Sequence, residues 1–228
     1  MVLTMLMIED FISNLRREFA IFCYGDKDTP PGYTEIPKTT ENDIYTHSPE
    51  YQIVSLRYHE DAYMKVLHTD LDKAIGLDKT VLDVGCSLGV TGLLLAHRGR
   101  SVTFHDYEGL GLKFLRQHIK KNELNARVVP YGEEVDLHDW VLATDVIEHA
   151  GDPLAFLHWM EKLGRKVIIT YPVTVEWQEP WKMARTDEWI DDLVIRKIIW
   201  NRHQVFIDKY GEGRRYLGYV IGDRECLL

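Results

Sequence analysis

Residues 81–92, Val-Leu-Asp-Val-Gly-Cys-Ser-Leu-Gly-Val-Thr-Gly, constrain the fold of this chain more than any other segment. An apolar strand leads through Asp83 into a turn that holds Gly85 and Gly89, and a helix follows. Glycines let ligand atoms touch bare backbone, and the amides at the start of the helix point to the same place. Asp83 would repel a bare pyrophosphate, so we expect a nucleotide-like ligand that carries a cation and hydroxyl groups.

After Gly76 short apolar segments alternate with segments of helical periodicity, which predicts a mostly parallel sheet with helices on both faces. The last two expected strands flank a glycine-containing turn and should pair as a hairpin. Asp152 and Pro153 are the residue types of a helix N-cap and first position. The expected strands are 80–84, 101–105, 126–130, 140–145, 166–171, 204–209 and 216–222, and the expected helices are 90–98, 110–122, 153–163 and 187–200.

The first 75 residues are expected to form a helical N-terminal extension, and residues 76–228 a single catalytic domain. Apolar residues recur at helical spacing over 8–22 and over 54–75, which predicts one helix in each range. Residues 25–50 hold four of the eight prolines and show no periodicity. We therefore expect a long loop there, of the kind that forms lids.

Composition narrows the functional classes. A formal charge of −9 disfavours a nucleic-acid partner, because phosphate backbones are held mainly by clustered Lys and Arg. No apolar run approaches the roughly 20 residues that a membrane span needs, and the three cysteines fit neither a disulfide framework nor a zinc knuckle. We expect a cytoplasmic protein without a membrane partner, and the sequence leaves its oligomeric state open.

A dinucleotide-dependent dehydrogenase also begins with a strand, a glycine turn and a helix. Its fingerprint requires glycine where Ser87 stands, so the spacing argues against that class. Asp106 closes the second expected strand, where a carboxylate can accept both hydroxyls of a ribose. The competing interpretation is that Asp106 is a loop residue that caps the helix after Gly109.

Three segments carry a resemblance to a known family: the glycine turn, Phe-His-Asp at 104–106, and Ala-Thr-Asp-Val-Ile-Glu-His at 143–149. Together they resemble the class I S-adenosylmethionine-dependent methyltransferases over about residues 76–173. The third segment is most similar to the branch with ubiquinone-biosynthesis and natural-product small-molecule methyltransferases. The resemblance implies an α/β, Rossmann-like, seven-stranded sheet with an antiparallel last strand. It also implies S-adenosylmethionine as the cofactor, S-adenosylhomocysteine as the product and a small-molecule acceptor methylated at O or N.

The same resemblance assigns roles to residues at the carboxyl ends of the expected strands. Asp83 is placed near the methionine ammonium, and Asp106 near the ribose. Asp145 either contacts the ligand or caps the segment that follows its strand. The residues that the resemblance implies for cofactor binding are Asp83, Gly85, Cys86, Ser87, Gly89, Asp106, Tyr107, Glu134 and Asp145.

His149 is the best-placed general base in the sequence, because it follows the fourth expected strand where the ligand crevice opens. The competing role for His149 is packing or hydrogen bonding. Tyr171, Trp177 and Trp181 follow the fifth expected strand, in the region that lines the acceptor pocket of the family. They suit a flat or apolar acceptor.

A weaker resemblance points to metal-dependent small-RNA terminal 2′-O-methyltransferases. It rests on Asp145, Glu148, His149 and His203, whose oxygen and imidazole groups suit Mg²⁺ or Mn²⁺. We expect no metal, because the match is partial and the net charge is unsuitable for RNA. The sequence also leaves open a methyltransferase that acts on nucleic acid or protein, and a pseudo-enzyme that binds the cofactor without transferring a methyl group.

Overall fold

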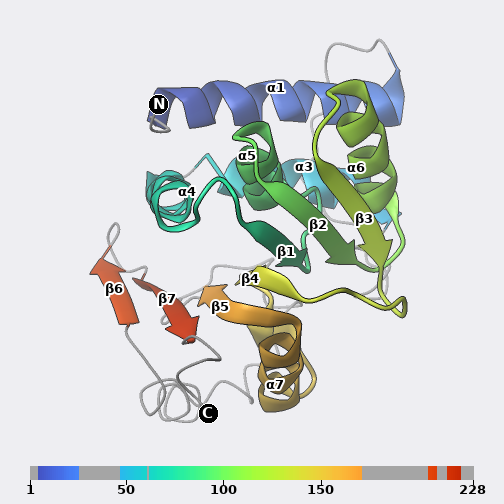
Figure 1. Ribbon diagram of the computed structural model, residues 1–228. Helices are drawn as coiled ribbons and strands as arrows, with labels where there is room; N and C mark the ends of the chain where they lie inside the picture. The colour runs from blue at the N-terminus through green and yellow to red at the C-terminus, as the bar shows by residue number, and fades with distance from the viewer. Residues whose placement is uncertain (1–4, 26–46, 61, 171–204, 210–214, 222–228) are drawn as a thin grey trace.

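The computed structural model describes residues 5–25, 47–60, 62–170, 205–209 and 215–221, and a twisted sheet organises them (Figure 1). The strands lie in the order β3-β2-β1-β4-β5-β7-β6. β1 to β5 are parallel to their neighbours, and β7 pairs antiparallel with both β5 and β6. The expected α/β class with a parallel sheet is confirmed. The strands are Thr80–Val84 (β1), Ser101–Asp106 (β2), Ala126–Pro130 (β3), His138–Thr144 (β4), Gly164–Thr170 (β5), Val205–Lys209 (β6) and Arg215–Ile221 (β7).

Helices cover both faces of the sheet, as the alternation of strands and helices predicts. On one side lie α5 (Val90–His97) and α6 (Leu110–Lys121), and α7 (Pro153–Leu163) lies on the other (Figure 1). Successive strand residues face opposite sides: Val81 packs in the cluster with α5, and Leu82 in the cluster with α7. The helix start at Asp152 is confirmed, since its Oδ1 accepts the Ala155 N–H at 2.9 Å and Pro153 follows.

The N-terminal helices pack on the same side of the sheet as α5 and α6. They are α1 (Met5–Tyr24), α3 (Pro49–Tyr58) and α4 (Ala62–Ala74), and α1 lies across α5 and α6 (Figure 1). Ile8, Ile12 and Phe19 of α1 are fully buried and belong to the same apolar cluster as Leu93 of α5. Burial on every side explains why α5 is mostly apolar, since Val90 to Ala96 are all buried.

The prediction of one continuous helix over 54–75 is wrong. α3 ends at Tyr58 and α4 begins at Ala62. The His59 N–H donates to the Leu56 carbonyl at 3.2 Å, a tighter turn than the helical pattern, at the point where α3 closes. The adjoining apolar stripes in the sequence therefore belong to two helices that pack on the same core.

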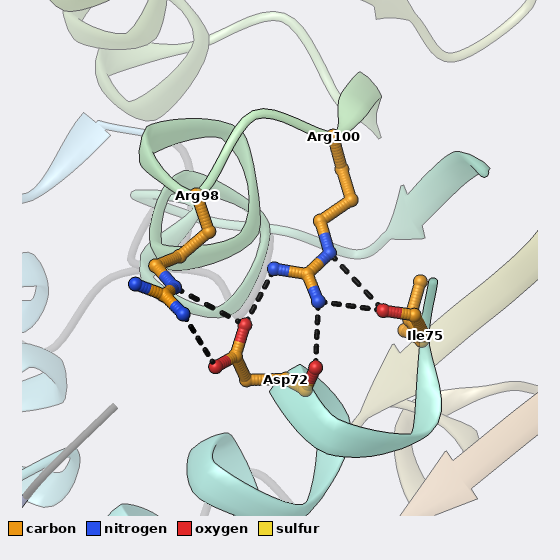
Figure 2. A network of polar contacts seen from close by, with 4 residues as sticks. All are labelled: Asp72, Ile75, Arg98 and Arg100. Atoms are coloured by element: carbon orange, nitrogen blue, oxygen red, sulfur yellow. Dashed lines mark hydrogen bonds and ion pairs between the residues drawn. The ribbon is translucent and has the colours of Figure 1, made fainter. Parts of the chain in front are cut away.

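A buried ion pair ties the end of α4 to the connection between α5 and β2 (Figure 2). Arg100 and Asp72 are 2% and 7% exposed, and the Arg100 Nη1 donates to Asp72 Oδ1. Arg100 Nη2 also donates to the carbonyls of Asp72 and Ile75, each at 2.6 Å. Arg98 approaches Asp72 Oδ2 at 3.3 Å from the more exposed side. The guanidinium thus satisfies carbonyls at the C-terminal end of α4, where a cation is favourable.

Parallel register brings the carboxyl ends of three strands together. Val84 is level with His105 on β2 and with Ala143 on β4. The residues that follow these strands therefore meet at one edge of the sheet, the usual position of ligand sites in open α/β sheets. No helix in the described ranges is long and apolar enough to cross a membrane.

Replacing Arg100 with methionine should lower the free energy of unfolding by about 3–5 kcal/mol, because Asp72 then keeps a buried charge without its main partner. Urea denaturation followed by circular dichroism measures the change. The matched control is Arg116→Met, which removes an exposed pair with Glu108 and should cost less than about 1 kcal/mol. Equal losses in the two variants would contradict a special role for the buried pair.

Candidate functional site

The turn of residues 85–89 connects β1 to α5 and requires glycine at both ends. Gly85 and Gly89 have φ of +63° and +69°, in the left-handed region. A Cβ on Gly85 would lie 2.6 Å from the Val146 Cγ1, and one on Gly89 would lie 2.7 Å from the Leu115 Cδ2. Both conformation and space therefore exclude a side chain, and the bare backbone of the turn is the result.

Ser87 lies in the middle of the turn with φ of +52°, an unusual value for a residue that has a Cβ. Its N–H donates to Asp106 Oδ2 at 2.7 Å, and its Oγ donates to Gln52 Oε1 at 2.6 Å. Its carbonyl oxygen lies 2.5 Å from where a Cβ on Gly111 would be. The surroundings of Ser87 thus fix its conformation from three directions.

Asp83 closes β1 as a buried acceptor, 2% exposed. Its Oδ2 accepts the N–H of Gly92 in α5 at 2.9 Å, and a Cβ on Gly92 would lie 2.6 Å from that oxygen. Burial raises the pKa of Asp83 to about 7, against the effect of the Gly92 N–H, and the charge of Asp106 raises it further. A cation bound at this carboxylate would lower its pKa and restore the charged form.

Asp106 at the end of β2 accepts two backbone N–H groups, from Ser87 to Oδ2 and from Tyr107 to Oδ1, each at 2.7 Å. Burial raises its pKa, and these two N–H groups oppose the shift. The competing interpretation of Asp106 as a helix cap is wrong, because α6 has Gly109 at its N-cap and no side-chain cap. Asp106 instead holds the glycine turn against the end of β2.

An exposed aromatic pair lies beside Asp106. Tyr107 and Tyr131 are 54% and 62% exposed, with ring centroids 4.7 Å apart. The Tyr131 N–H donates to the Asp106 carbonyl at 2.6 Å, which sets Tyr131 at this edge. Their exposed rings offer aromatic surface next to a carboxylate. The sequence reasoning singled out Tyr107 and missed Tyr131, although its position directly after β3 was an available signal.

Two other predicted cofactor residues occupy different surroundings. Cys86 is half-buried, and burial with the negative charges of Asp106 and Asp83 raises the pKa of its thiol well above the ordinary value. The thiol therefore stays protonated and a poor nucleophile. Glu134 is exposed on the loop after β3, past the turn in which the Glu133 N–H donates to the Pro130 carbonyl.

The segment after β4 borders the glycine turn, because Val146 fills the space where a Gly85 side chain would lie. Asp145 has φ of +53°, and its N–H donates to the Thr170 carbonyl at 3.0 Å. Its Oδ1 accepts the Thr170 hydroxyl at 3.2 Å, so the carboxylate joins the ends of β4 and β5. His149 is exposed at the end of the short 3-10 helix Ile147–His149 (η1), four residues beyond Asp145.

The predicted acceptor residues Tyr171, Trp177 and Trp181, like the predicted helix 187–200, lie outside the described residues. The weaker metal hypothesis includes His203 and the Glu148 side chain, which also lie outside them. Among the residues that the structure describes, no group of three or more His, Cys, Asp or Glu side chains is arranged to hold a metal ion.

Gln52 is a further residue that sequence reasoning missed. It is 1% exposed on α3 and reaches the glycine turn through Ser87. No pattern in the sequence marks it, because its contact joins residues 35 positions apart.

Comparison with known proteins finds methyltransferases, the class of protein that the sequence motifs resemble. Residues 57–140 match the family described as Methyltransferase small domain. A ubiquinone biosynthesis O-methyltransferase from Nitrosomonas europaea is 31% identical over 101 residues, which are 41% of this chain and 43% of that protein. The chain thus spans less than half the length of this curated relative.

Solved structures agree on the fold. TehB from Haemophilus influenzae superposes with a TM-score of 0.56 at 15% identity, over 70% of this chain and 62% of that one. Magnesium protoporphyrin IX methyltransferase from Synechocystis, with bound S-adenosylmethionine, superposes with a TM-score of 0.55 at 18% identity, over 74% and 83%. The comparisons confirm the resemblance to class I S-adenosylmethionine-dependent methyltransferases that the sequence motifs indicate.

Stability should depend on pH through Asp83. Its pKa is about 7 in the folded chain and 3.8 ordinarily, so folding takes up a proton between these values. Its contribution to stability is full below about pH 4 and is lost as the pH rises through about 7. Asp83→Asn keeps an acceptor for the Gly92 N–H and removes the titration. Urea denaturation of both proteins across this range should show wild type losing stability relative to the variant, and a constant difference would contradict the assignment.

Proposed function

We propose that this chain, which has the fold and motifs of class I methyltransferases, transfers a methyl group from S-adenosylmethionine to an O or N atom of a small molecule. The observation that carries the proposal is the pair of carboxylates, the buried Asp83 and the partly buried Asp106, on either side of a glycine turn. The two carboxylates lie at the same edge of the sheet because β1 and β2 are parallel, with Asp83 level with Phe104, two residues before Asp106. A ligand with a cation at one end and a ribose at the other matches the two groups.

The described residues fit this cofactor group by group. The Asp83 carboxylate suits the methionine ammonium, whose positive charge would offset the burial that raises the Asp83 pKa. Asp106 suits the ribose hydroxyls, and the exposed rings of Tyr107 and Tyr131 suit the adenine. We assign Gly85, Cys86, Ser87 and Gly89 to the backbone that borders the methionine, with Glu134 at the adenine edge and Asp145 at the crevice.

A dinucleotide would fit this turn poorly. Asp83 places a carboxylate beside the amides at the start of α5, where a pyrophosphate would have to lie. The Gly92 N–H already donates to Asp83 Oδ2, so it is not available to a phosphate. We therefore rank a nucleotide-dependent dehydrogenase below the methyltransferase.

Methyl transfer requires alignment more than acid chemistry. When bound, S-adenosylmethionine supplies a methyl carbon that its sulfonium has already made electrophilic. The glycine turn and the Asp145 segment then act by orientation, which can contribute much of the rate. We assign to His149, exposed beyond β4 and close in sequence to the turn's neighbour Val146, the removal of a proton from the acceptor.

The acceptor proposal is a small molecule. It is supported by the O-methyltransferase name of the curated relative, by the magnesium protoporphyrin IX neighbour and by the net charge of −9. We assign Tyr171, Trp177 and Trp181 to the acceptor pocket. We assign residues 76–228 to the catalytic domain and residues 1–75 to an extension over its site. The competing functions are a methyltransferase with a protein or nucleic-acid acceptor and a pseudo-enzyme, and an acceptor screen separates them.

Calorimetry should show binding of S-adenosylhomocysteine and none of NAD. Asp106→Ala should weaken S-adenosylhomocysteine binding about 10- to 100-fold, through loss of charge-assisted hydrogen bonds to the ribose. Asp136→Ala removes an exposed carboxylate beyond β3 and is the matched control, with unchanged affinity. Tight NAD binding without S-adenosylhomocysteine binding would overturn the proposal, and unchanged affinity in Asp106→Ala would overturn the ribose assignment alone.

His149→Ala should lower turnover about 10²- to 10⁴-fold while leaving S-adenosylhomocysteine affinity and unfolding free energy near the wild-type values. Turnover is measured as release of S-adenosylhomocysteine during a screen of phenol, carboxylate and amine acceptors. His158→Ala, on α7, is the control, because His158 pairs with Glu161 away from the glycine turn. Loss of folded protein in His149→Ala would indicate a structural role, and loss of wild-type activity on chelation would favour the metal-dependent mechanism.

A further inference from the structure

A buried glutamine of the N-terminal helices makes a direct contact with the glycine turn. Gln52 lies on α3 and is 1% exposed. Its Oε1 accepts the hydroxyl of Ser87 at 2.6 Å. Burying an amide is costly unless it forms hydrogen bonds, so this contact offsets part of the cost of placing Gln52 there.

We propose that Gln52 is a positioning residue for the cofactor. It holds Ser87 in its left-handed conformation, and Ser87 in turn holds Asp106 through its N–H. The inference rests on the proposed function, because Asp106 is the group that we assign to the ribose. It adds to that function a residue from outside the strand-turn-helix segment. Cofactor affinity then depends on the position of α3.

The conformation of Ser87 needs this support. A φ of +52° costs a residue with a Cβ on the order of 1 kcal/mol or more. Glycine would adopt it freely, but serine keeps it only while its neighbours favour it. The Ser87 N–H lies 2.7 Å from Asp106 Oδ2 in this conformation. Because α5 is anchored in the core, a relaxation of Ser87 toward negative φ would have to be taken up by the rest of the turn, and this would move the N–H relative to the Asp106 carboxylate.

The contacts of α3 explain how Gln52 is held in place. Ser48 caps the helix, since its Oγ accepts the Tyr51 N–H at 3.2 Å. The Ser48 hydroxyl donates to Glu50 Oε2 at 2.8 Å, and Tyr24 of α1 donates to Glu50 Oε1 at 3.2 Å. These polar contacts join α1 to the first turn of α3, next to Gln52. The N-terminal helices therefore fix the acceptor that the Ser87 hydroxyl meets.

A double-mutant cycle on S-adenosylhomocysteine affinity tests the proposal. Gln52→Leu leaves the Ser87 hydroxyl without its acceptor, and Ser87→Ala removes the hydroxyl but keeps the Cβ. Each single variant should bind about 5- to 10-fold more weakly, the range expected for one buried hydrogen bond. The double variant should be no weaker than either single variant, because both remove the same contact.

Ser87→Gly distinguishes positioning from general stability. Glycine tolerates positive φ without the hydroxyl contact, so Gln52→Leu should change S-adenosylhomocysteine affinity by less than about 2-fold in this background. Ile53→Val is the control on the same helix: Ile53 is 4% exposed in the core, and its variant should lower unfolding free energy without changing affinity. Unfolding free energies of all variants are measured in parallel.

The outcomes separate this inference from the proposed function. Two results would overturn the positioning role while the methyltransferase proposal stands, provided that wild type binds S-adenosylhomocysteine. In one, the affinity loss of the double variant equals the sum of the two single losses. In the other, Gln52→Leu weakens binding as much in the Ser87→Gly background as in wild type. If Ile53→Val weakens binding as much as Gln52→Leu, the effect is general loosening of α3 and the role is again overturned. If wild type binds no S-adenosylhomocysteine, both proposals fail.

Discussion

The site depends on how closely the turn after β1 is packed against β2, β4 and α6. In and around this turn, a Cβ would come within 2.7 Å of a neighbouring atom at Gly85, Gly89, Gly92 and Gly111. Because the backbone approaches so closely, the N–H groups of Ser87 and Gly92 reach Asp106 and Asp83 at 2.7 and 2.9 Å. Backbone donors thereby hold the carboxylates of Asp83 and Asp106 in place. Close packing at these glycines thus sets the positions of the hydrogen-bonding groups in the site.

The N-terminal helices are joined to this arrangement by polar contacts as well as by the apolar core. Arg100 holds the end of α4 through Asp72, and Gln52 of α3 meets Ser87. Glu18 of α1 contacts His118 Nδ1 at 2.8 Å and Lys121 Nζ at 2.6 Å, both on α6. The Gln52 contact ends on the glycine turn, the Glu18 contacts end on α6, and the Arg100 pair ends on the connection between α5 and β2. Loosening the N-terminal helices should therefore affect stability through the last two contacts and the site through the first.

Local sequence was sufficient wherever neighbouring residues decide the outcome. The described strands lie within two residues of their predicted bounds, because a short apolar run between turn residues has few other ways to bury its side chains. Asp83 and Asp106 could be paired because parallel strands end at the same edge of a sheet. The helix over 54–75 was predicted wrongly, since two helices that pack on one core show the same apolar spacing as a single helix.

The sequence by itself determined the class of fold, the glycine turn and the two carboxylates beside it, because these follow from residues close together in the chain. Only the tertiary structure decided which groups meet that turn from elsewhere. Gln52 reaches Ser87, and the Tyr131 ring centroid lies 4.7 Å from the Tyr107 ring centroid, because separate helices and strands fold against each other. Their contacts depend on distances between elements, and spacing along the chain carries no information about those distances.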